Sequence, residues 1–144
     1  SKYQSVIDKN LVENARYLLQ QGNDIGQMMK VVGEEGTTID DFIIYLKAEY
    51  VDAVYLQQDA FDTVDAASSI ERQKHVFLLI SKILEAQLAI EEKEEARHFF
   101  HLLTQITRDW NRVEMDTNKF KELEMKITKN FTEASKNAES VSSN

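Results

Sequence analysis

The sequence predicts an all-α protein, a helical bundle of about five to six helices. The 144 residues include no proline and only four glycines, so little interrupts long helical segments. Apolar residues recur at spacings of three and four along most of the chain, which is the period of an amphipathic helix. With 42% hydrophobic residues, the chain can bury a core. We predict a single helical domain over residues 1–138, followed by a frayed polar tail over residues 139–144.

Two short helices are predicted before residue 33. The stretch "LVENARYLLQQG" is predicted to form the first helix and to end at Gly22, a natural C-terminal residue. The stretch "DIGQMMKVVG" is predicted to form the second, with Asp24 as N-cap and Gly33 as the stop. Their apolar stripes are Leu11, Ala15, Leu18, Leu19, Ile25, Met28, Met29 and Val32.

A third helix is predicted from Thr38, which with Asp41 resembles a capping box, to about Gln58. Its inward face is predicted to carry Phe42, Leu46, Tyr50, Ala53 and Gln57. The stretch "DAFDTVDAASS" follows, with three aspartates, two serines and one large aromatic residue. Such a composition favours caps and turns over a packed core, so we predict a non-helical turn at about residues 59–68. Phe61 is anomalous in such a turn.

Three further stripes predict the remaining helices. Ser68 and Glu71 form a capping box, so the fourth helix is predicted to start at about Ser69. The segment "EEKEEA" before the fifth stripe contains no helix breaker, and we expect a bend or short hairpin near Glu91 to Glu95, within a helical hairpin near residues 85–100. Asp116 or Thr117 is expected to cap the last helix. The stripes are Ile70, Phe77, Ile80, Ile83, Leu84 and Leu88; then Phe99, Leu102, Leu103, Ile106 and Trp110; then Phe120, Leu123, Ile127, Phe131 and Ala134.

The charge balance and the apolar pattern exclude several classes of partner. Asp and Glu number 25 against 17 Lys and Arg, for a net charge of −8, whereas phosphate-backbone binding needs a basic surface. We therefore expect no nucleic-acid partner. No apolar run approaches the roughly 20 residues of a membrane span, so we expect a soluble chain without direct membrane insertion. We take a cytoplasmic setting as the prior, and the serine at position 1 suggests that the parent protein is larger.

The residues alone carry no catalytic or metal-binding motif. The glycine pairs in "GNDIG" and "GEEG" are not followed by Lys-Ser or Lys-Thr, so helix ends explain them better than a phosphate loop does. Glu95 and His98 form a single E-x-x-H, whereas di-iron bundles need two. There is no cysteine, and the serines concentrate at caps and in the tail. These observations predict no catalytic residue and no metal ligand, as in a non-enzymatic helical module.

One stretch carries a family resemblance. "YLQQDAF-x-x-VD", Tyr55 to Asp65, resembles the "FLQQNAFDEVD" segment in the C-terminal helical domain of the catalytic A subunit of V-type and archaeal-type rotary ATPases. The upstream stretches "ARYLLQQGNDIGQMMKVVG" and "FIIYLKAEYVDAVYLQQDAF" resemble the same domain, and the similarity covers roughly Asn10 to Leu84. It implies that the chain is a fragment. In that family, the phosphate loop, the catalytic glutamate and the magnesium ligand belong to the preceding nucleotide-binding domain. The resemblance therefore implies that ATP or ADP with Mg binds only in the full-length subunit and that this chain in isolation does not hydrolyse ATP.

The resemblance also implies roles for three residues of the turn. Gln58 would approach the edge of the adenine, Ala60 would leave room beside the base, and Phe61 would supply an aromatic face. A rigid aromatic held on a turn suits stacking on a base, which contributes roughly 1 to 3 kcal/mol in stacking platforms. The alternative is an ordinary core phenylalanine whose turn dips inward.

The resemblance finally implies partners. In the intact complex these would be the B subunit of the ATPase and the central stalk subunits, in the cytoplasmic, peripheral head of a membrane-bound, proton- or sodium-transporting complex. Closure of the domain on ATP would push on the stalk, with Leu84 to Phe100 as the candidate contact. We expect the fragment alone to be monomeric or weakly self-associating. The competing hypotheses are a free-standing helical protein–protein interaction module and, third, a metal-dependent bundle enzyme.

Overall fold

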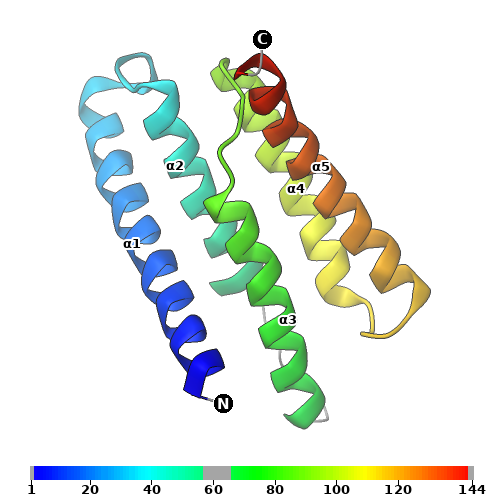
Figure 1. Cartoon of the computed structure of the whole chain (residues 1–144). Helices are drawn as coiled ribbons and strands as arrows, with labels where there is room; N and C mark the ends of the chain where they lie inside the picture. The colour runs from blue at the N-terminus through cyan, green and yellow to red at the C-terminus, as the bar shows by residue number, and fades with distance from the viewer. Residues whose placement is uncertain (1, 57–65, 143–144) are drawn as a thin grey trace.

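The chain folds into a bundle of antiparallel helices, and the computed structural model describes residues 2–56 and 66–142 of it (Figure 1). Successive α-helices run up and down the bundle, and in this view α3 lies in front, between α2 and α4. The described residues contain no β-strand, which confirms the predicted all-α fold. The elements are α1 (Lys2–Val32), the 3₁₀ turn η1 (Glu34–Gly36), α2 (Ile39–Val51), the π-helix η2 (Asp52–Leu56), α3 (Ala66–Glu85), α4 (Lys93–Arg112) and α5 (Asn118–Ser142).

The first helix differs from the prediction, because α1 is one continuous helix through Gly22 and Asp24. Gly22 does not end a helix. It lies against α2, where an added Cβ would be 2.3 Å from the Cβ of Ala48. Asp24 is not an N-cap either, since its carboxylate accepts a hydrogen bond from Gln20 Nε2 (3.1 Å), one helical turn earlier. Gly22 therefore serves close packing between α1 and α2.

Three of the predicted helix ends are confirmed. Helix α1 ends one residue before Gly33, whose φ of 79° suits glycine. Thr38 Oγ1 accepts a hydrogen bond from the backbone N–H of Asp41 (3.2 Å) and so caps α2. Thr117 Oγ1 accepts one from the backbone N–H of Phe120 (3.1 Å) at the start of α5. Asp116, the alternative cap, instead has a φ of 69° in the preceding turn.

The predicted C-terminal bound of the non-helical turn at 59–68 is wrong. Helix α3 already begins at Ala66, so Ser68 lies within it and is not its N-cap. Before the turn, the predicted third helix consists of α2 and the π-helix η2, which together reach Leu56. Residues 57–65, and with them the predicted end near Gln58, lie outside the described residues.

An extended strap, residues 86–92, separates α3 from α4. The predicted interruption therefore exists, but it starts before Glu91. Of residues 85–100, for which a helical hairpin was predicted, Glu85 ends α3 and the others form this strap and the first turns of α4. The strap is held by long-range contacts. The ammonium of Lys47 donates to the carbonyl of Leu84 at the end of α3 and to the carbonyl of Ala86 at the start of the strap. The N–H of Ala89 donates to the carbonyl of Ala134 in α5 (3.2 Å). Ile90 is buried.

The core lies where α2, α3, α4 and α5 meet, and it corrects parts of the predicted stripes. Phe77 is only half-buried, whereas its neighbour Val76 is fully buried. Ile70 and Leu102, both predicted to point inward, are exposed. Buried hydrophobic residues that form the core cluster are Phe42, Ile43, Leu46, Tyr50, Val51, Val54, Val76, Leu79, Ile80, Ile83, Ile90, Ala96, Phe100, Leu103, Trp110, Phe120, Leu123 and Ile127.

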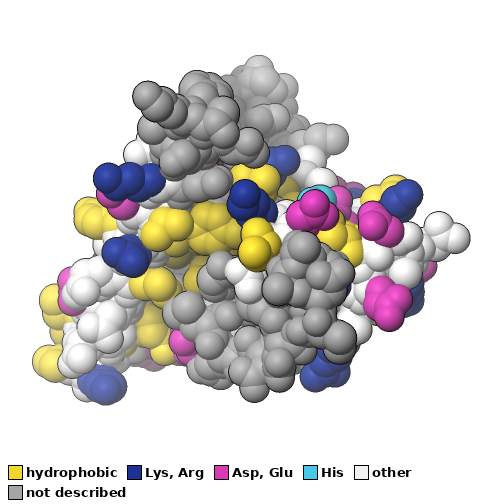
Figure 2. Space-filling view, turned by 90° about the horizontal axis from the view of Figure 1, so that it is seen from below, with side chains coloured by type: hydrophobic (Ala, Val, Ile, Leu, Met, Phe, Trp, Pro, Cys, Tyr) yellow, Lys and Arg dark blue, Asp and Glu magenta, His cyan; other side chains and the backbone are white. Residues whose placement is uncertain are grey.

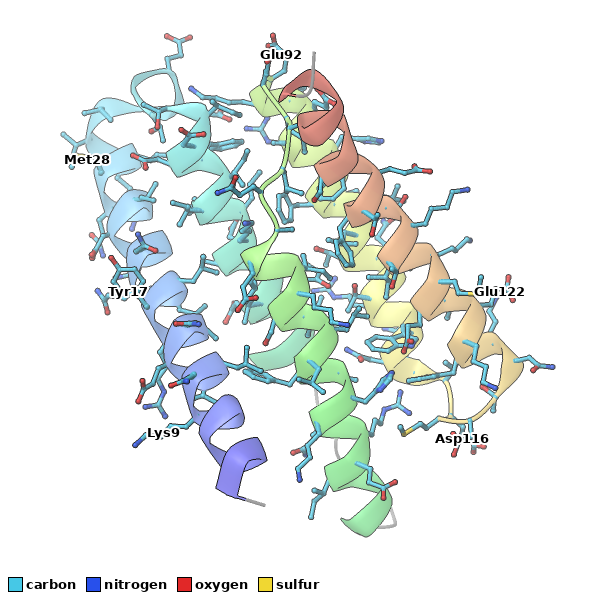
Figure 3. All side chains as sticks on the ribbon, in the orientation of Figure 1. Lys9, Tyr17, Met28, Glu92, Asp116 and Glu122 are labelled. Atoms are coloured by element: carbon cyan, nitrogen blue, oxygen red, sulfur yellow. The ribbon has the colours of Figure 1, made fainter. Side chains whose placement is uncertain are left out.

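The outer faces are polar with scattered apolar residues. Tyr17 and Met28 project from the outer face of α1, and Glu122 from α5 (Figure 3). Within the described part of the chain, no helix combines the length and the apolar character that crossing a membrane requires. Helix α5 is assigned to Ser142. The division of the chain into one helical domain over residues 1–138 and a frayed polar tail over residues 139–144 stays a prediction.

Candidate functional site

The three predicted site residues, Gln58, Ala60 and Phe61, lie outside the described residues. The structure does describe the two chain segments that flank them. These are the π-helix η2 and the start of α3, which we call the two roots of segment 57–65. Seen along the bundle from below, hydrophobic side chains gather in the middle of this end of the molecule (Figure 2).

The first root is tied to the C-terminal turn of α4. Asn111 Nδ2 donates a 3.0 Å hydrogen bond to the carbonyl of Val54, inside the π-helix. Both residues are buried, and Val54 has no exposed surface. A π-helix shifts backbone hydrogen bonds from the usual i→i−4 pattern, and such turns are frequent at functional sites. The Asn111 amide therefore fixes the backbone of this turn against α4.

The second root is tied to the same turn of α4 by Arg72. Its Nη2 donates to the carbonyls of Trp110 (3.2 Å) and Asn111 (2.6 Å), and its guanidinium lies 5.5 Å from the ring centroid of Phe120. Burial lowers the pKa of Arg72 from its usual value. A cation at the carbonyl end of a helix also interacts favourably with the helix dipole. The last turn of α4 is thus a common anchor for η2 and α3.

A buried hydroxyl pair adds to this anchor one turn earlier. Tyr50 and Thr107 share a 2.8 Å hydrogen bond between α2 and α4, and neither side chain is accessible to solvent beyond a trace. Burial raises the pKa of Tyr50, so its hydroxyl stays protonated. The burial of Thr107, Asn111 and Arg72 was not predicted from the sequence. Each has a partner 38 or more residues away, and no local pattern signals such pairs.

The opposite end of the bundle is acidic. The η1 turn and the N-terminal turn of α4 lie side by side there, and both carry exposed carboxylates. Two basic residues of α4 hold them together: Lys93 Nζ donates to the carbonyl of Glu34 (2.6 Å), and Arg97 forms an ion pair with Glu34. Arg97 also pairs with Glu94 and lies 5.3 Å from the ring centroid of Phe42. We call this surface the acidic end; its exposed carboxylates are Glu34, Glu35, Asp40, Asp41, Glu91, Glu92, Glu94 and Glu95.

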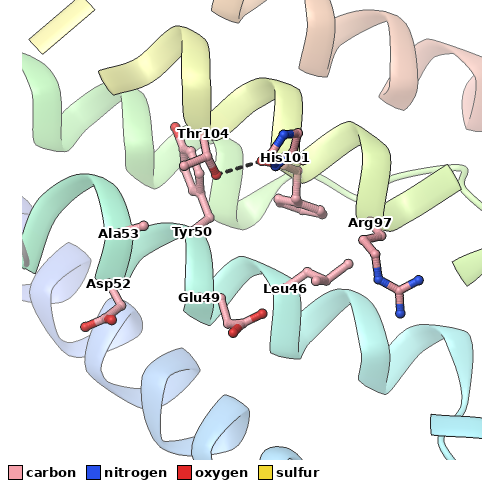
Figure 4. Close-up of a pocket in the computed structure, with 9 residues that line it drawn as sticks. Leu46, Glu49, Tyr50, Asp52, Ala53, Arg97, His101 and Thr104 are labelled. Carbon is pink, nitrogen blue, oxygen red and sulfur yellow. Dashed lines mark hydrogen bonds between the residues drawn. The ribbon is translucent and has the colours of Figure 1, made fainter. Parts of the chain in front are cut away.

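A groove of about 340 Å³ opens between α2 and α4 (Figure 4). The carboxylate of Glu49 lies on its α2 wall, and the imidazole of His101 on its α4 wall. The dashed bond in Figure 4 joins Thr104 Oγ1 to the carbonyl of Phe100 (2.7 Å), within one helix. This groove was not predicted from the sequence, because its lining residues come from two segments that are far apart in the chain.

Neither a phosphate loop nor a metal-binding cluster is found where the sequence offered a candidate among the described residues. The turn between Gly33 and Gly36 contains two exposed glutamates, which repel phosphate, and no Lys-Ser or Lys-Thr follows it. No group of three or more histidine, aspartate or glutamate side chains within residues 2–56 and 66–142 is arranged to hold a metal ion. Glu95 and His98, the single E-x-x-H, are both exposed.

Comparisons with known proteins agree with the resemblance. Residues 9–99 match the family described as the C-terminal domain of V and A type ATP synthase. The chain is 46% identical over 127 residues to the V-type ATP synthase alpha chain of Borrelia duttonii, covering 88% of this chain and 22% of the relative. It is 48% identical over 124 residues to the V-type ATP synthase alpha chain of Borreliella burgdorferi, covering 86% of this chain and 22% of the relative. It is 44% identical over 127 residues to V-type ATP synthase alpha chain 1 of Treponema pallidum, covering 88% of this chain and 22% of the relative.

The chain therefore spans about a fifth of the length of these relatives. No solved structure matches it. The family match extends over α1, η1, α2, η2, α3, the strap and the first turns of α4, so it includes both roots and the acidic end. By sequence, the chain belongs to the family of C-terminal domains of V- and A-type ATP synthases.

Proposed function

We propose that this domain walls the adenine side of the ATP site of a rotary ATPase catalytic subunit and passes nucleotide-driven movement to the central stalk. The observation that carries the proposal is the double anchoring of segment 57–65. Asn111 holds its first root through the Val54 carbonyl, and Arg72 holds its second root on the last carbonyls of α4. A segment whose two flanks are fixed on one helix can present a side chain in a defined position.

The residues that would meet the nucleotide follow from the resemblance. Gln58 would face the adenine edge, Ala60 would leave space for the base, and Phe61 would stack on it. Stacking on an aromatic ring contributes roughly 1 to 3 kcal/mol per base. Because the Gly33–Gly36 turn carries glutamates and no metal-binding cluster is found among the described residues, we assign phosphate and Mg binding to the remainder of the full-length subunit. ATP or ADP with Mg would therefore bind only there, and this domain would supply one wall.

The acidic end is the proposed contact with the stalk. It includes the N-terminal part of α4 within Leu84 to Phe100 and, through the contacts of Lys93 and Arg97 with Glu34, the η1 turn as well. Carboxylates from two separate segments thus share one surface at the end of the bundle away from the roots. Such a surface favours a basic partner surface and steers its approach. Movement of the domain about the nucleotide would displace this surface.

The remaining assignments follow from membership of the assembled complex. The B subunit and the central stalk subunits would be its partners, in a peripheral head on the cytoplasmic side of a membrane, and the transported ion would be a proton or sodium. ATP hydrolysis would require the rest of the catalytic subunit, so this domain alone would turn over no ATP. The alternative function is a free-standing helical interaction module, for which the groove between α2 and α4 would be the docking surface.

The test of the adenine wall uses two Phe61 variants in the full-length subunit assembled in its complex. Phe61→Leu keeps an apolar side chain but removes the aromatic face, whereas Phe61→Trp keeps a stacking face. We expect Phe61→Leu to raise the KM for ATP about ten- to a hundredfold, the equivalent of one stacking contact, and Phe61→Trp to stay near the original value. Steady-state kinetics of ATP hydrolysis measure both.

Two results would count against the proposal. An unchanged KM in Phe61→Leu would show that the ring does not contact the base. Equal losses in both variants, together with lowered stability, would show that Phe61 is a core residue which tolerates neither change. If this chain performed its function without any nucleotide-binding domain, that result would instead support the alternative of a free-standing interaction module.

A further inference from the structure

We propose that Lys47 is a positioning residue that ties α2 to the strap, and thereby carries movement of α2 to the acidic end. The inference rests on the proposed function and adds the residue through which movement would pass inside the domain. Lys47 lies in the middle of α2, which continues into the π-helix and so into the first root. The strap leads from the end of α3 to the acidic end.

The geometry of Lys47 is unusual for a lysine. Only 8% of its surface is exposed. Its ammonium donates two 2.8 Å hydrogen bonds, to the carbonyl of Leu84 in the last turn of α3 and to the carbonyl of Ala86 in the strap. The last carbonyls of a helix lack intrahelical partners and carry partial negative charge, so a cation there is favourable. One side chain of α2 thus holds the point at which α3 becomes the strap.

Stability alone does not explain a lysine at this site. No ion pair formed among the described residues includes Lys47, and its neighbours Leu46 and Ala48 are also buried. Burial lowers the pKa of Lys47 to about 8, which reflects the unfavourable transfer of its charge into the interior. Buried charges can often be replaced by apolar residues of similar volume without loss of stability. The two specific carbonyl contacts are therefore what this lysine adds.

The strap transmits position because it is held along its length. Beyond Ala86, the N–H of Ala89 donates to the carbonyl of Ala134, and the Ile90 side chain is buried. The strap then reaches Lys93, which donates to the carbonyl of Glu34 in η1. A displacement of α2 relative to α5 would act on the strap first through Lys47. A spatial route of this kind becomes a demonstrated coupling only when both ends respond to one change.

The experiment uses the full-length subunit in its assembled, membrane-reconstituted complex. Lys47→Met removes the ammonium at nearly constant volume, and Lys47→Gln is a second variant that keeps an amide donor on a shorter side chain. Lys82→Met is the matched control, because Lys82 is an exposed lysine in the last turn of α3. Three quantities are measured: amide hydrogen exchange of residues 86–92, ions transported per ATP hydrolysed, and the KM for ATP.

We expect Lys47→Met to increase hydrogen exchange in the strap at least about tenfold, since hydrogen bonds to charged groups are stronger than neutral ones. Ion transport per ATP should fall while the KM for ATP stays unchanged, and Lys82→Met should change none of the three quantities. Lys47→Gln should show the same changes to a smaller extent. If the Met variant fails to assemble, the Gln variant decides by the same criteria.

Two outcomes would overturn the inference. Unchanged exchange in the strap would show that Lys47 does not hold it. Increased exchange with unchanged ion transport per ATP would show that the strap is held but carries no movement. Neither outcome depends on the adenine wall, which is tested by the KM of Phe61→Leu. Failure of the adenine wall and failure of this inference are therefore separate results.

Discussion

A single added methyl group at Gly22 should test how α1 packs on α2. In Gly22→Ala, the new Cβ would lie 2.3 Å from the Cβ of Ala48, well inside the ordinary contact distance of about 3.5 to 4.0 Å. Both atoms are close to rigid backbone, so no side chain can rotate away. The two helices must separate locally by about 1 Å or more, which opens voids on either side of the contact.

The expected magnitude follows from two opposing terms. Replacing glycine by alanine in a helix interior gains about 1 kcal/mol of helix propensity. Overpacking typically costs about 1 to 3 kcal/mol, and the overlap at Gly22 places it at the upper end. We therefore expect Gly22→Ala to lower the free energy of unfolding by about 2 kcal/mol.

Gly26 provides a matched control one helical turn later on α1. An added Cβ there would lie 3.1 Å from Cε1 of Tyr45, the outer part of a half-buried ring that can shift. Gly26→Ala has the same propensity gain without contact to rigid backbone. We expect it to be neutral or up to about 1 kcal/mol more stable than the original chain. Urea unfolding followed by circular dichroism compares the two variants directly.

The double variant Gly22→Ala/Ala48→Gly moves the methyl group from α2 to α1 and removes the overlap. We expect it to be more stable than the sum of the two single changes predicts, by about 2 kcal/mol. If Gly22→Ala were as stable as Gly26→Ala, or if the double variant showed only additive losses, α1 would not pack on α2 in this register.

Two further predictions concern the core and the buried lysine. On α3, Ile83→Ala should lower the free energy of unfolding by about 2 to 5 kcal/mol, because this side chain is fully buried. Leu78→Ala, at 43% exposure, should lower it by about 1 kcal/mol or less. Equal losses of stability in urea unfolding would contradict the assignment of the buried face. For Lys47, the folded chain releases its proton at about pH 8 and the unfolded chain at 10.5, so the folded chain binds fewer protons between these values and its stability rises with pH there. Relative to Lys47→Met, the free energy of unfolding of the original chain should rise by about 3 kcal/mol between pH 8 and 10.5, and below pH 8 the two chains should have the same pH dependence. Urea unfolding at a series of pH values measures this, and a difference between the two chains that stays constant over the whole range would refute it.

Local signals predicted the helix ends that depend on local hydrogen bonds. Thr38 and Thr117 accept from backbone N–H groups three residues later, and Gly33 adopts a positive φ directly after α1. These features involve only neighbouring residues, so they can be inferred from the sequence. Gly22 shows the limit of such inference. Glycine follows the end of α1 at Gly33 but permits close packing within the same helix at Gly22, and only the position of Ala48 on α2 distinguishes the two cases.

The anchors of the candidate site were not predictable in the same way. Arg72, Asn111 and Thr107 are polar, and sequence periodicity places polar residues on the solvent side. They are nevertheless buried, and each forms a hydrogen bond with a carbonyl or a hydroxyl of a distant segment. The strap illustrates a related effect. Its residues include good helix formers, but the contacts of Ala86, Ala89 and Ile90 with other helices override that propensity.

The most direct test of the central claim is to locate the adenine against this chain. The full-length subunit in its complex would be photolabelled with an ATP analogue that carries an azide on the adenine ring, and the labelled peptide identified by mass spectrometry. The adenine-wall proposal predicts label on residues 57–65, reduced by excess ATP and reduced in Phe61→Leu. Saturating, ATP-protected labelling confined to parts of the subunit outside this domain would contradict it.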